Sequence, residues 1–502
     1  MNPPNSPVIS HTIALAAGAA LACAFAPLNA WWMALICPAL LMWLWEGSTP
    51  RRAAWNGLLF GCGTFGLGTW WLYVSVHGFG GAPIWLTLVI VLGLVGIMGA
   101  YHALMGFLAV RFLPAAGAAR YFVGLPALWL LIEWWRGWFL SGFPWLTLGT
   151  SQTDSWLGGL APVIGAYGIS LLLLLGSGSL LALARAPKML WTPALALLLL
   201  PWPLAWALGF IDWTRPEGPA VTVAVLQGAI PQDQKWQADN VEPTRDLYTN
   251  LDSQALGAQL IVWPESALPQ LANEVPQYLG QLYSQAAARG SDIVMGIIRA
   301  DDGDNYYNSI MTMAQHQHVT FYDKHHLVPF AEFFPVPPFV RSWLRLMSLP
   351  YSDFTAGAAD QPAVAAGGTI LSLSICYEDA YGSLNLAALE QARLLVNVTN
   401  DAWFGHSWAR YQHFQISRMR AMEARRPLVR AANDGISALV GARGEVLARA
   451  PEFQSTVLRG TVQPRSGLPP FARLGNIPVV LLALAGFGLL AARQIRVRRQ
   501  PN

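Results

Sequence analysis

The sequence predicts a membrane protein with two parts, a bundle of about eight transmembrane α-helices and a separate layered α/β domain. Three observations predict this fold class. Of the 502 residues, 54% are hydrophobic and only 12% are charged, whereas an ordinary soluble protein has about 25% charged residues. Of the 31 basic and 28 acidic residues, only seven basic and three acidic ones lie within residues 1–210. Beyond residue 210, strand-like and helix-like segments alternate.

Eight apolar runs are candidates for crossing the membrane, because a helix needs about 20 apolar residues to span the hydrocarbon core. Their ranges are 8–28, 31–46, 54–78, 84–110, 121–140, 159–184, 189–210 and 477–492. No basic segment precedes the first run and a second run follows almost at once, so we expect no cleaved signal peptide. The sequence therefore predicts a transmembrane domain with seven helices over 1–212 and a C-terminal transmembrane helix over 476–493.

The basic residues predict the orientation of these helices. If the N-terminus is cytoplasmic, the inner loops contain Arg51, Arg52, Arg111, Arg120, Arg185 and Lys188. The arginine-rich tail after residue 492 then lies on the same side. The short outer loops, around 29–30, 79–83 and 141–158, contain no Lys or Arg. This distribution is typical of the positive-inside rule. We therefore expect residues 213–475 outside the cytoplasm, in a periplasmic or extracellular position.

The segment from 218 to 465 predicts a layered α/β domain, and its roughly 250 residues are ample for a core. The strand-like runs are 221–230, 259–268, 292–300, 308–314, 369–379 and 392–401. The helical candidates are 242–257, 274–289, 383–391 and 408–426. The net charge of +3 reflects membrane topology, and nothing in its distribution indicates nucleic-acid binding.

Cys376 is the only cysteine outside a long apolar run, because Cys23, Cys37 and Cys62 all lie in hydrophobic stretches. A lone cysteine at the end of a strand is more often a small core residue. In an oxidising compartment, however, this thiol would have no disulfide partner. That favours a reactive thiol.

Two further strand-end segments supply the groups that a thiol nucleophile needs. "IVWPESALP" contains Glu265, and "FYDKHHLVPFAEFFP" contains Lys324 and, eight residues later, Glu332. Glu265 is the candidate base, and Lys324 is the candidate cation that stabilises an oxyanion together with a backbone N–H. Singly, such residues are usually solvated loop residues. Their combination, with apolar and proline-rich flanks, favours a catalytic site.

The chain resembles the nitrilase (carbon–nitrogen hydrolase) superfamily in its Glu–Lys–Cys order, and more closely the apolipoprotein N-acyltransferase family along its whole length. The motifs that carry the resemblance are "GFPW" (142–145), "LQGAIPQDQKW" (226–236), "WPESALP" (263–269), "YYNSI" (306–310), "KHHLVPFAEFFP" (324–335), "CYED" (376–379) and the segment 400–435. One departure lies beside the triad, where the family often has Lys-Asn-His and this chain has Lys324-His325-His326.

The resemblance implies a periplasmic, nitrilase-like αββα sandwich over 218–465 in a multi-pass protein of the bacterial inner membrane. It implies that Cys376 takes a fatty acyl chain from the sn-1 ester of a phospholipid, with phosphatidylethanolamine as the expected donor. The acyl group would then pass by a ping-pong route to the α-amine of a diacylglyceryl-cysteine lipoprotein. We expect no cofactor and a monomeric protein.

Further site residues follow from the same resemblance. Glu332 and Glu378 would orient Lys324 and tune the local field, and Tyr377 would supply a backbone N–H beside the nucleophile. Asn308 and Trp236 match family positions near the active site. The alternatives are solvated acids for the two carboxylates and simple packing for the aromatic residues.

Arg136 and Trp145 are substrate-binding candidates in the membrane part. Arg136 is the only basic residue on the outer half of the membrane region, where it could hold a lipid phosphate. The alternative is an interfacial arginine whose head reaches toward water from an aromatic belt. A proline-rich segment, 333–355, is a candidate lid over the site.

Two other function classes stay open. A membrane-tethered amidase would hydrolyse its intermediate with water, but it needs only one anchor. A lipid-binding or transporter-like protein would carry a degenerate catalytic domain, whereas Glu265, Lys324 and Cys376 are all present. A metal site is not expected, since the histidines at 325, 326, 406 and 413 lack the spacing and acidic partners of a zinc helix.

Overall fold

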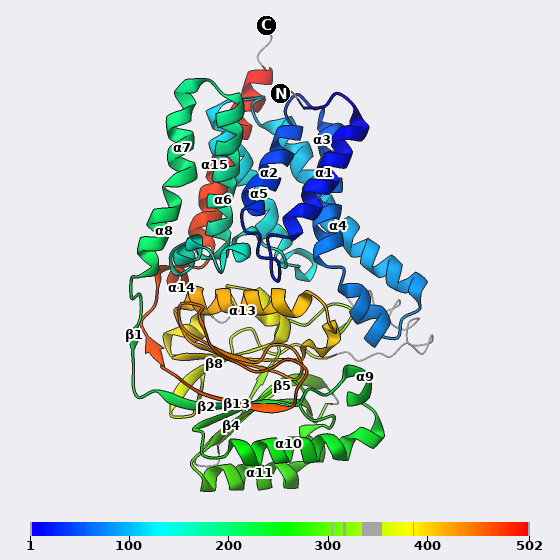
Figure 1. The fold of residues 1–502 in the computed structure, drawn as a ribbon, viewed down its shortest axis with the longest axis vertical. Helices are drawn as coiled ribbons and strands as arrows, with labels where there is room; N and C mark the ends of the chain where they lie inside the picture. Colours follow the sequence, from blue (N-terminus) through cyan, green and yellow to red (C-terminus); the bar gives the residue numbers. More distant parts are fainter. Residues whose placement is uncertain (1–2, 304, 315–317, 334–353, 385, 500–502) are drawn as a thin grey trace. The chain divides into compact units, whose positions relative to one another are not determined.

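The computed structural model describes residues 3–303, 305–314, 318–333, 354–384 and 386–499 (Figure 1). The chain folds into two compact units. The helical unit comprises Met1–Asp212, Phe404–Glu423 and Pro469–Asn502. The sheet unit comprises Trp213–Trp403 and Ala424–Leu468.

The helical unit consists mostly of apolar helices, because its sequence offers long runs with few charged side chains to solvate. The α-helices of this unit are α1 (Pro7–Ala22), α2 (Met33–Leu44), α3 (Pro50–Gly68), α4 (Ile84–Phe112), α5 (Leu125–Arg136), α6 (Ala161–Arg185), α7 (Trp191–Leu199), α8 (Pro201–Gly209), the more polar α13 (Ala409–Ala424), α14 (Pro470–Leu474) and α15 (Ile477–Arg499). The last residue of α13 is counted in the sheet unit.

Four helical segments within the described residues are long and apolar enough to cross a membrane. They are Ile84–Phe112, Trp156–Arg185, Lys188–Gly209 and Ile477–Arg498. Helices α1 and α2 are apolar but shorter. Apolar helices are therefore present in the region where the sequence predicts them, whereas the eight crossings and their orientation stay predictions.

Helices α1, α3 and α4 approach one another closely where glycine residues lie between them. A Cβ atom at Gly18 of α1 would lie 1.9 Å from the carbonyl oxygen of Phe60 in α3. A Cβ atom at Gly57 of α3 would lie 2.0 Å from the carbonyl oxygen of His102 in α4. Such distances exclude any side chain at these positions. Small residues of this kind let helix backbones pack tightly inside a bilayer.

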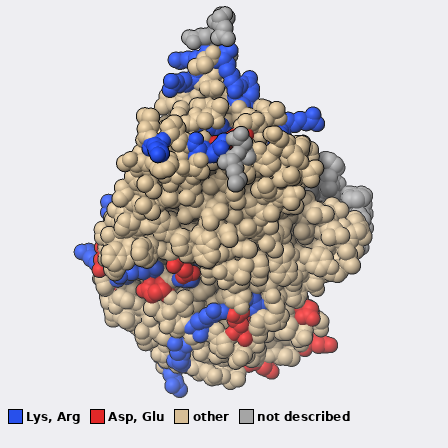
Figure 2. All heavy atoms as spheres, turned by 45° about the horizontal axis from the view of Figure 1, so that its top comes forward, with Lys and Arg blue, Asp and Glu red and all other residues tan. Residues whose placement is uncertain are grey.

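Basic residues lie around the end of the C-terminal helix, next to a broad surface without charges (Figure 2). Helix α15 contributes Arg493, Arg496 and Arg498, which are exposed. Clusters of this kind at the end of an apolar helix are typical of the cytoplasmic side of a membrane. The side on which this end lies stays a prediction.

The sheet unit contains two six-stranded mixed sheets among its described residues. The first sheet has the order β13–β2–β3–β4–β5–β6, with β2 (Val221–Gln227), β3 (Leu260–Trp263), β4 (Asp292–Ala300), β5 (Tyr306–Ala314), β6 (His318–Asp323) and β13 (Thr456–Val462). The second has the order β12–β11–β10–β9–β8–β7, with β7 (Val364–Ala366), β8 (Thr369–Ile375), β9 (Leu394–Thr399), β10 (Leu428–Ala432), β11 (Ala438–Val440) and β12 (Val446–Arg449). A short antiparallel pair joins β1 (Arg215–Pro216) to β14 (Arg465–Ser466).

The first sheet is buried on both faces, as its nearly continuous apolar strands predict. Alternation along β2 sends Val223 and Val225 into a core shared with the second sheet, and Ala224 and Leu226 into a core under helices. Those helices are α10 (Val241–Ala255) and α11 (Pro276–Ala288), which lie along one face of the sheet (Figure 1). The sheet unit thus stacks a helical layer on two sheets, which gives three of the four layers of the predicted αββα sandwich. The helix predicted over 408–426 forms as α13, but it is grouped with the helical unit.

The structure confirms most predicted elements of the α/β region, and it differs in one helix and in several strands. The expected helix over 383–391 is wrong, because its described residues form a 3₁₀ turn at Ala387–Glu390. The sequence predicts no strand at β6 or β7 and none after residue 401, whereas β10 to β14 all follow that residue. Strand β10 is short and contains the fully buried Arg430, so its sequence lacks the apolar run of a central strand.

Candidate active site

Glu265 follows β3 in a turn that the backbone holds tightly. Pro264 ends the strand because proline has no N–H to donate to the ladder. Ser266, the residue after Glu265, has a φ of 44°. The Ala267 N–H donates to the carbonyl of Gly296 in β4 at 2.9 Å. A Cβ atom at Gly296 would lie 2.4 Å from the carbonyl oxygen of Pro264. A glycine is therefore required opposite the turn that presents Glu265.

Lys324 follows β6 and is fixed on both sides by its backbone. Its N–H donates to the carbonyl of Asn308 at 2.8 Å, and its own carbonyl accepts from the Gly357 N–H at 2.9 Å. The preceding residue, Asp323, accepts two hydrogen bonds from the Arg299 guanidinium at 2.8 and 2.6 Å.

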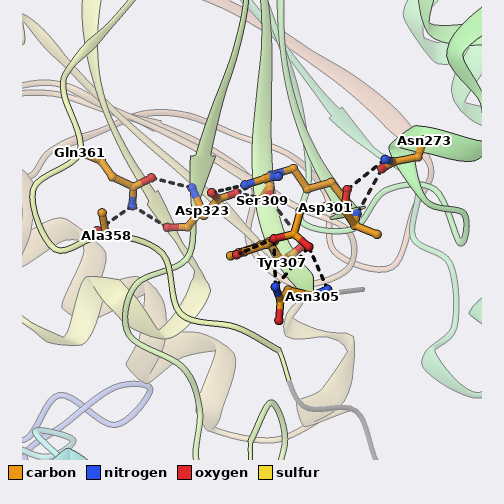
Figure 3. A network of polar contacts seen from close by, with 10 residues as sticks. Asn273, Asp301, Asn305, Tyr307, Ser309, Asp323, Ala358 and Gln361 are labelled. Carbon is orange, nitrogen blue, oxygen red and sulfur yellow. Dashed lines mark hydrogen bonds and ion pairs between the residues drawn. The ribbon is translucent and has the colours of Figure 1, made fainter. Parts of the chain in front are cut away.

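The side-chain network around Asp323 extends to the segment that follows residue 353 (Figure 3). Ser309 donates to the Asp323 carboxylate at 2.7 Å. The Gln361 amide accepts from the Asp323 N–H and donates to its carbonyl, at 2.8 and 2.6 Å. This network fixes the end of β6, and with it the backbone position of Lys324.

Cys376 begins a 3₁₀ turn directly after β8, with a φ of 50°. A non-glycine residue in this left-handed region is strained, and such strain is concentrated at functional positions. The turn is held by Glu378, whose carboxylate accepts from the Ile375 N–H at 2.8 Å. The same carboxylate accepts from the N–H groups of His325 and His326 at 2.8 and 3.2 Å. Glu378 therefore ties the cysteine turn to the segment that follows Lys324.

The side chains of the predicted triad meet in one buried polar cluster. Lys324 Nζ lies 2.8 Å from Glu332 Oε1 and 3.6 Å from Glu265 Oε1. Asn308 Nδ2 donates to both carboxylates, at 2.7 Å to Glu265 and 2.8 Å to Glu332. Cys376 interacts electrostatically with both Lys324 and Glu265. One ammonium and one amide thus hold two carboxylates beside the thiol.

The electrostatics define the resting charges of this cluster. Burial alone lowers the pKa of Lys324, but Glu332, Glu265 and Cys376 outweigh burial and raise this pKa above its ordinary value. Burial and the charge of Glu265 raise the pKa of Cys376, although Lys324 opposes them. The site therefore rests with a charged lysine and a protonated thiol. A base must take the thiol proton as the sulfur attacks.

Two family models and many relatives match this chain. Residues 17–179 match the apolipoprotein N-acyltransferase N-terminal domain, and residues 222–467 match the carbon-nitrogen hydrolase family. The apolipoprotein N-acyltransferase of Methylococcus capsulatus is 38% identical over 489 residues, which are 96% of either chain. That of Nitrosomonas europaea is 40% identical over 485 residues, covering 95% of this chain and 96% of the relative. The chain belongs to the apolipoprotein N-acyltransferase family.

Membership in the apolipoprotein N-acyltransferase family confirms the prediction of an acyltransferase with a carbon–nitrogen hydrolase domain. Among solved structures, a carbon-nitrogen hydrolase from Helicobacter pylori G27 is 16% identical, with a TM-score of 0.36, over 55% of this chain and 96% of that one.

The structure adds a buried charge network behind the cysteine of this family member. Arg430 of β10 lies 2.9 Å from Asp401 and 3.4 Å from Asp379, and it donates to Asn397 Oδ1 at 2.7 Å. Thr399 donates to Asp401 at 3.1 Å and also hydrogen-bonds to the Cys376 side chain. Sequence reasoning missed this network. The sequence signal that could have found it is the pair of acidic residues, Asp379 and Asp401, that follow two apolar strands.

Of the remaining predicted residues, Tyr377 and Trp236 belong to the sheet unit, and Arg136 and Trp145 belong to the helical unit. The Tyr377 ring packs on those of His326 and Tyr381, with centroids 6.1 and 5.4 Å away. Trp236 is 50% exposed at the end of α9 (Gln232–Lys235). The candidate lid, 333–355, lies outside the described residues over 334–353.

Arg136 and Trp145 belong to the helical unit. Arg136 is buried, and its Nη1 donates to the carbonyls of Phe143 and Trp145, the latter at 2.8 Å. Its guanidinium also faces the Phe65 ring at 5.1 Å. The Trp145 indole donates to Gln412 Oε1 at 2.7 Å. These contacts hold the "GFPW" loop on α5 and on α13, and binding of a lipid phosphate by Arg136 stays a prediction.

Proposed function

We propose that this protein transfers a fatty acyl chain from the sn-1 ester of a membrane phospholipid, through a thioester on Cys376, to the N-terminal amine of a diacylglyceryl-cysteine lipoprotein. The observation that carries this proposal is the buried cluster of Glu265, Lys324 and Cys376 in a chain that also has membrane-length apolar helices. The relatives' names, which specify N-acylation of apolipoproteins, supply the acceptor class.

In the first half-reaction, Glu265 takes the thiol proton while the sulfur of Cys376 attacks the ester carbonyl. Lys324, 3.6 Å from Glu265, stabilises the negative oxygen of the tetrahedral intermediate together with a backbone N–H, a role suited to a fixed cation in a dry site. The carbon–oxygen bond breaks, and Glu265 returns its proton to the departing glycerol oxygen. The products are a lysophospholipid and the Cys376 thioester.

In the second half-reaction, the lipoprotein's free α-amine attacks the thioester carbonyl. Glu265 accepts a proton from the amine, and Lys324 again stabilises the oxyanion. The carbon–sulfur bond breaks, an amide forms, and the thiolate of Cys376 recovers the proton from Glu265. Because the first product leaves before the acceptor reacts, the kinetics are ping-pong.

The membrane arrangement follows from the same proposal. We place a transmembrane domain over 1–212, a catalytic domain over 218–465 and a closing helix over 476–493, with the catalytic domain on the periplasmic side of a bacterial inner membrane. A phospholipid donor, with phosphatidylethanolamine as the first candidate, explains why the chain has several apolar helices. A membrane-tethered amidase, the alternative, would need only one.

Acyl-enzyme formation tests the proposal. Full-length protein in nanodiscs is incubated with phosphatidylethanolamine that carries a labelled sn-1 chain. We expect label on the protein that hydroxylamine removes, no label on Cys376→Ala, and transfer of the label to a diacylated lipopeptide with a free amine. Label that persists in Cys376→Ala contradicts the mechanism. Release of free fatty acid without transfer to the lipopeptide would instead support the amidase.

A further inference from the structure

A second lysine is buried beside the candidate base. The chain contains only three lysines, Lys188, Lys235 and Lys324, and Lys235 has no exposed surface. Its Nζ donates to the backbone carbonyl of Glu265 at 3.3 Å, and it interacts electrostatically with the charge of that residue. The Trp236 ring lies beside it, 5.8 Å from Nζ. Lysine is almost never fully buried without a carboxylate partner, so this position requires an explanation.

The segment that carries Lys235 is held rigidly by two asparagines that follow strands of the second sheet. Asn433 donates to the carbonyl of Ile230 at 2.9 Å, and its own carbonyl accepts from the Ala229 N–H at 2.7 Å. Asn400 donates to the side chain of Gln232 at 2.7 Å. The position of Lys235 is therefore fixed by the fold, and its ammonium is aimed at the turn that presents Glu265.

The charges of the site indicate what this ammonium does. The carboxylates of Glu265 and Glu332 share one cation, Lys324, which is closer to Glu332. Glu378 adds a third buried carboxylate, and Cys376 becomes a further negative group when it reacts. Within the described residues, no carboxylate forms an ion pair with Lys235. Its charge therefore remains to offset the negative field around Glu265, where a low dielectric makes each charge effective.

We propose that Lys235 is an electrostatic positioning residue, which anchors the backbone of Glu265 and places a positive charge beside the candidate base. The inference rests on the proposed role of Glu265 as the base. The other groups that face Glu265 are Lys324, Asn308 and Cys376. Unlike those three groups in the contacts cited above, Lys235 donates to the main chain of Glu265. It therefore acts through that residue.

The sign of the pH dependence follows from the burial of Lys235. Burial lowers its pKa to about 8, although the charge of Glu265 opposes this shift. The ammonium is thus present below about pH 8 and is lost above it. A methionine at this position removes the charge at every pH, whereas an arginine keeps it above pH 8, because a guanidinium stays protonated in proteins.

The test uses full-length protein in nanodiscs and follows two reactions against pH. The first is alkylation of Cys376 by iodoacetamide, read by mass spectrometry of its peptide, which requires no acyltransferase activity. The second is label transfer from the sn-1 chain of phosphatidylethanolamine to Cys376. The variants are Lys235→Met, Lys235→Arg and a charge-matched control, Arg245→Met, which removes an arginine paired with Glu242 on α10.

For Lys235→Met we expect both pH profiles to move upward by about 1 pH unit, since a nearby opposite charge lowers a carboxyl pKa by about 1–3 units. Lys235→Arg should restore the wild-type midpoint. Arg245→Met should follow the wild type. If Lys235→Met does not fold, Lys235→Gln replaces it, since the neutral amide keeps a donor for the Glu265 carbonyl.

Three outcomes overturn the inference. They are a Lys235→Met profile that coincides with the wild type or is lower at every pH with an unchanged midpoint, an equal shift in Arg245→Met, and a Lys235→Arg midpoint that moves together with that of Lys235→Met. If the wild type takes no label from phospholipid, the proposed function fails, but the alkylation profiles still decide the role of Lys235.

Discussion

At the scale of single residues, the site depends on the unequal distances between one lysine and two carboxylates. Lys324 lies 2.8 Å from Glu332 and 3.6 Å from Glu265, so Glu332 takes the closer contact and leaves Glu265 less tightly paired. A base that formed the tighter ion pair would accept a proton less readily, because the cation stabilises its charged form. Glu332 therefore supports catalysis through Lys324, without touching the reacting atoms.

The variant Glu332→Gln should release Lys324 toward Glu265 and weaken the base. We expect the rate of acyl-enzyme formation to fall by about tenfold or more, a fraction of the 10²–10⁴-fold effect of a general base, while the protein stays folded. Single-turnover labelling from phosphatidylethanolamine measures the rate, with Glu274→Gln as a control at an exposed carboxylate. An unchanged rate would contradict this role and leave Glu332 with a structural one, in which its carboxylate accepts a hydrogen bond from the Val328 N–H at 2.8 Å.

At the scale of elements, the second sheet keeps its buried charges balanced through β10. Arg430 has no exposed side-chain surface and contacts both Asp379, after β8, and Asp401, after β9. Three parallel strands are therefore joined at their carboxyl ends by one guanidinium, directly behind the turn of Cys376. Breaking a buried pair by removing one partner costs about 3–5 kcal/mol, because the other charge is left uncompensated.

Arg430→Met should therefore destabilise the sheet unit by that amount, which corresponds to a thermal midpoint lower by roughly 10 °C for a domain of 150–250 residues. Thermal unfolding in detergent, followed by tryptophan fluorescence, measures the change. Arg459→Met on β13, where the arginine is exposed, should shift the midpoint little. Equal shifts in the two variants would contradict a special role for the buried network.

The same elements show what the sequence could predict and what it could not. Glu265, Lys324 and Cys376 were found because each lies in a segment that reads as the end of a strand, where α/β folds collect functional residues. Glu265 and Lys324 follow β3 and β6 of the first sheet, and Cys376 follows β8 of the second. Arg430 was missed because a charged residue in a five-residue strand contradicts the usual pattern of a buried strand. Lys235 was also missed as a site residue, since its burial depends on Asn433, almost 200 residues away, and no local pattern encodes that contact.

At the scale of the whole molecule, the proposed function requires the sheet unit and the basic C-terminal end to lie on opposite sides of the membrane. A phospholipid ester in the outer leaflet and a lipoprotein amine both lie outside the cytoplasm, so the thiol must do so as well. The arginines of α15 predict a cytoplasmic end, because basic residues are retained on that side during insertion.

Single introduced cysteines test this arrangement in intact cells with a permeabilised outer membrane. In a Cys376→Ala background, Ser253→Cys on the exposed side of α10 should react with a membrane-impermeant maleimide. Arg496→Cys on α15 should react only after the inner membrane is disrupted. The native cysteines at 23, 37 and 62 lie in the helical unit, and the background without either introduced cysteine gives their contribution. Labelling of both positions in intact cells would place them on the same side and would remove the periplasmic thiol from the mechanism.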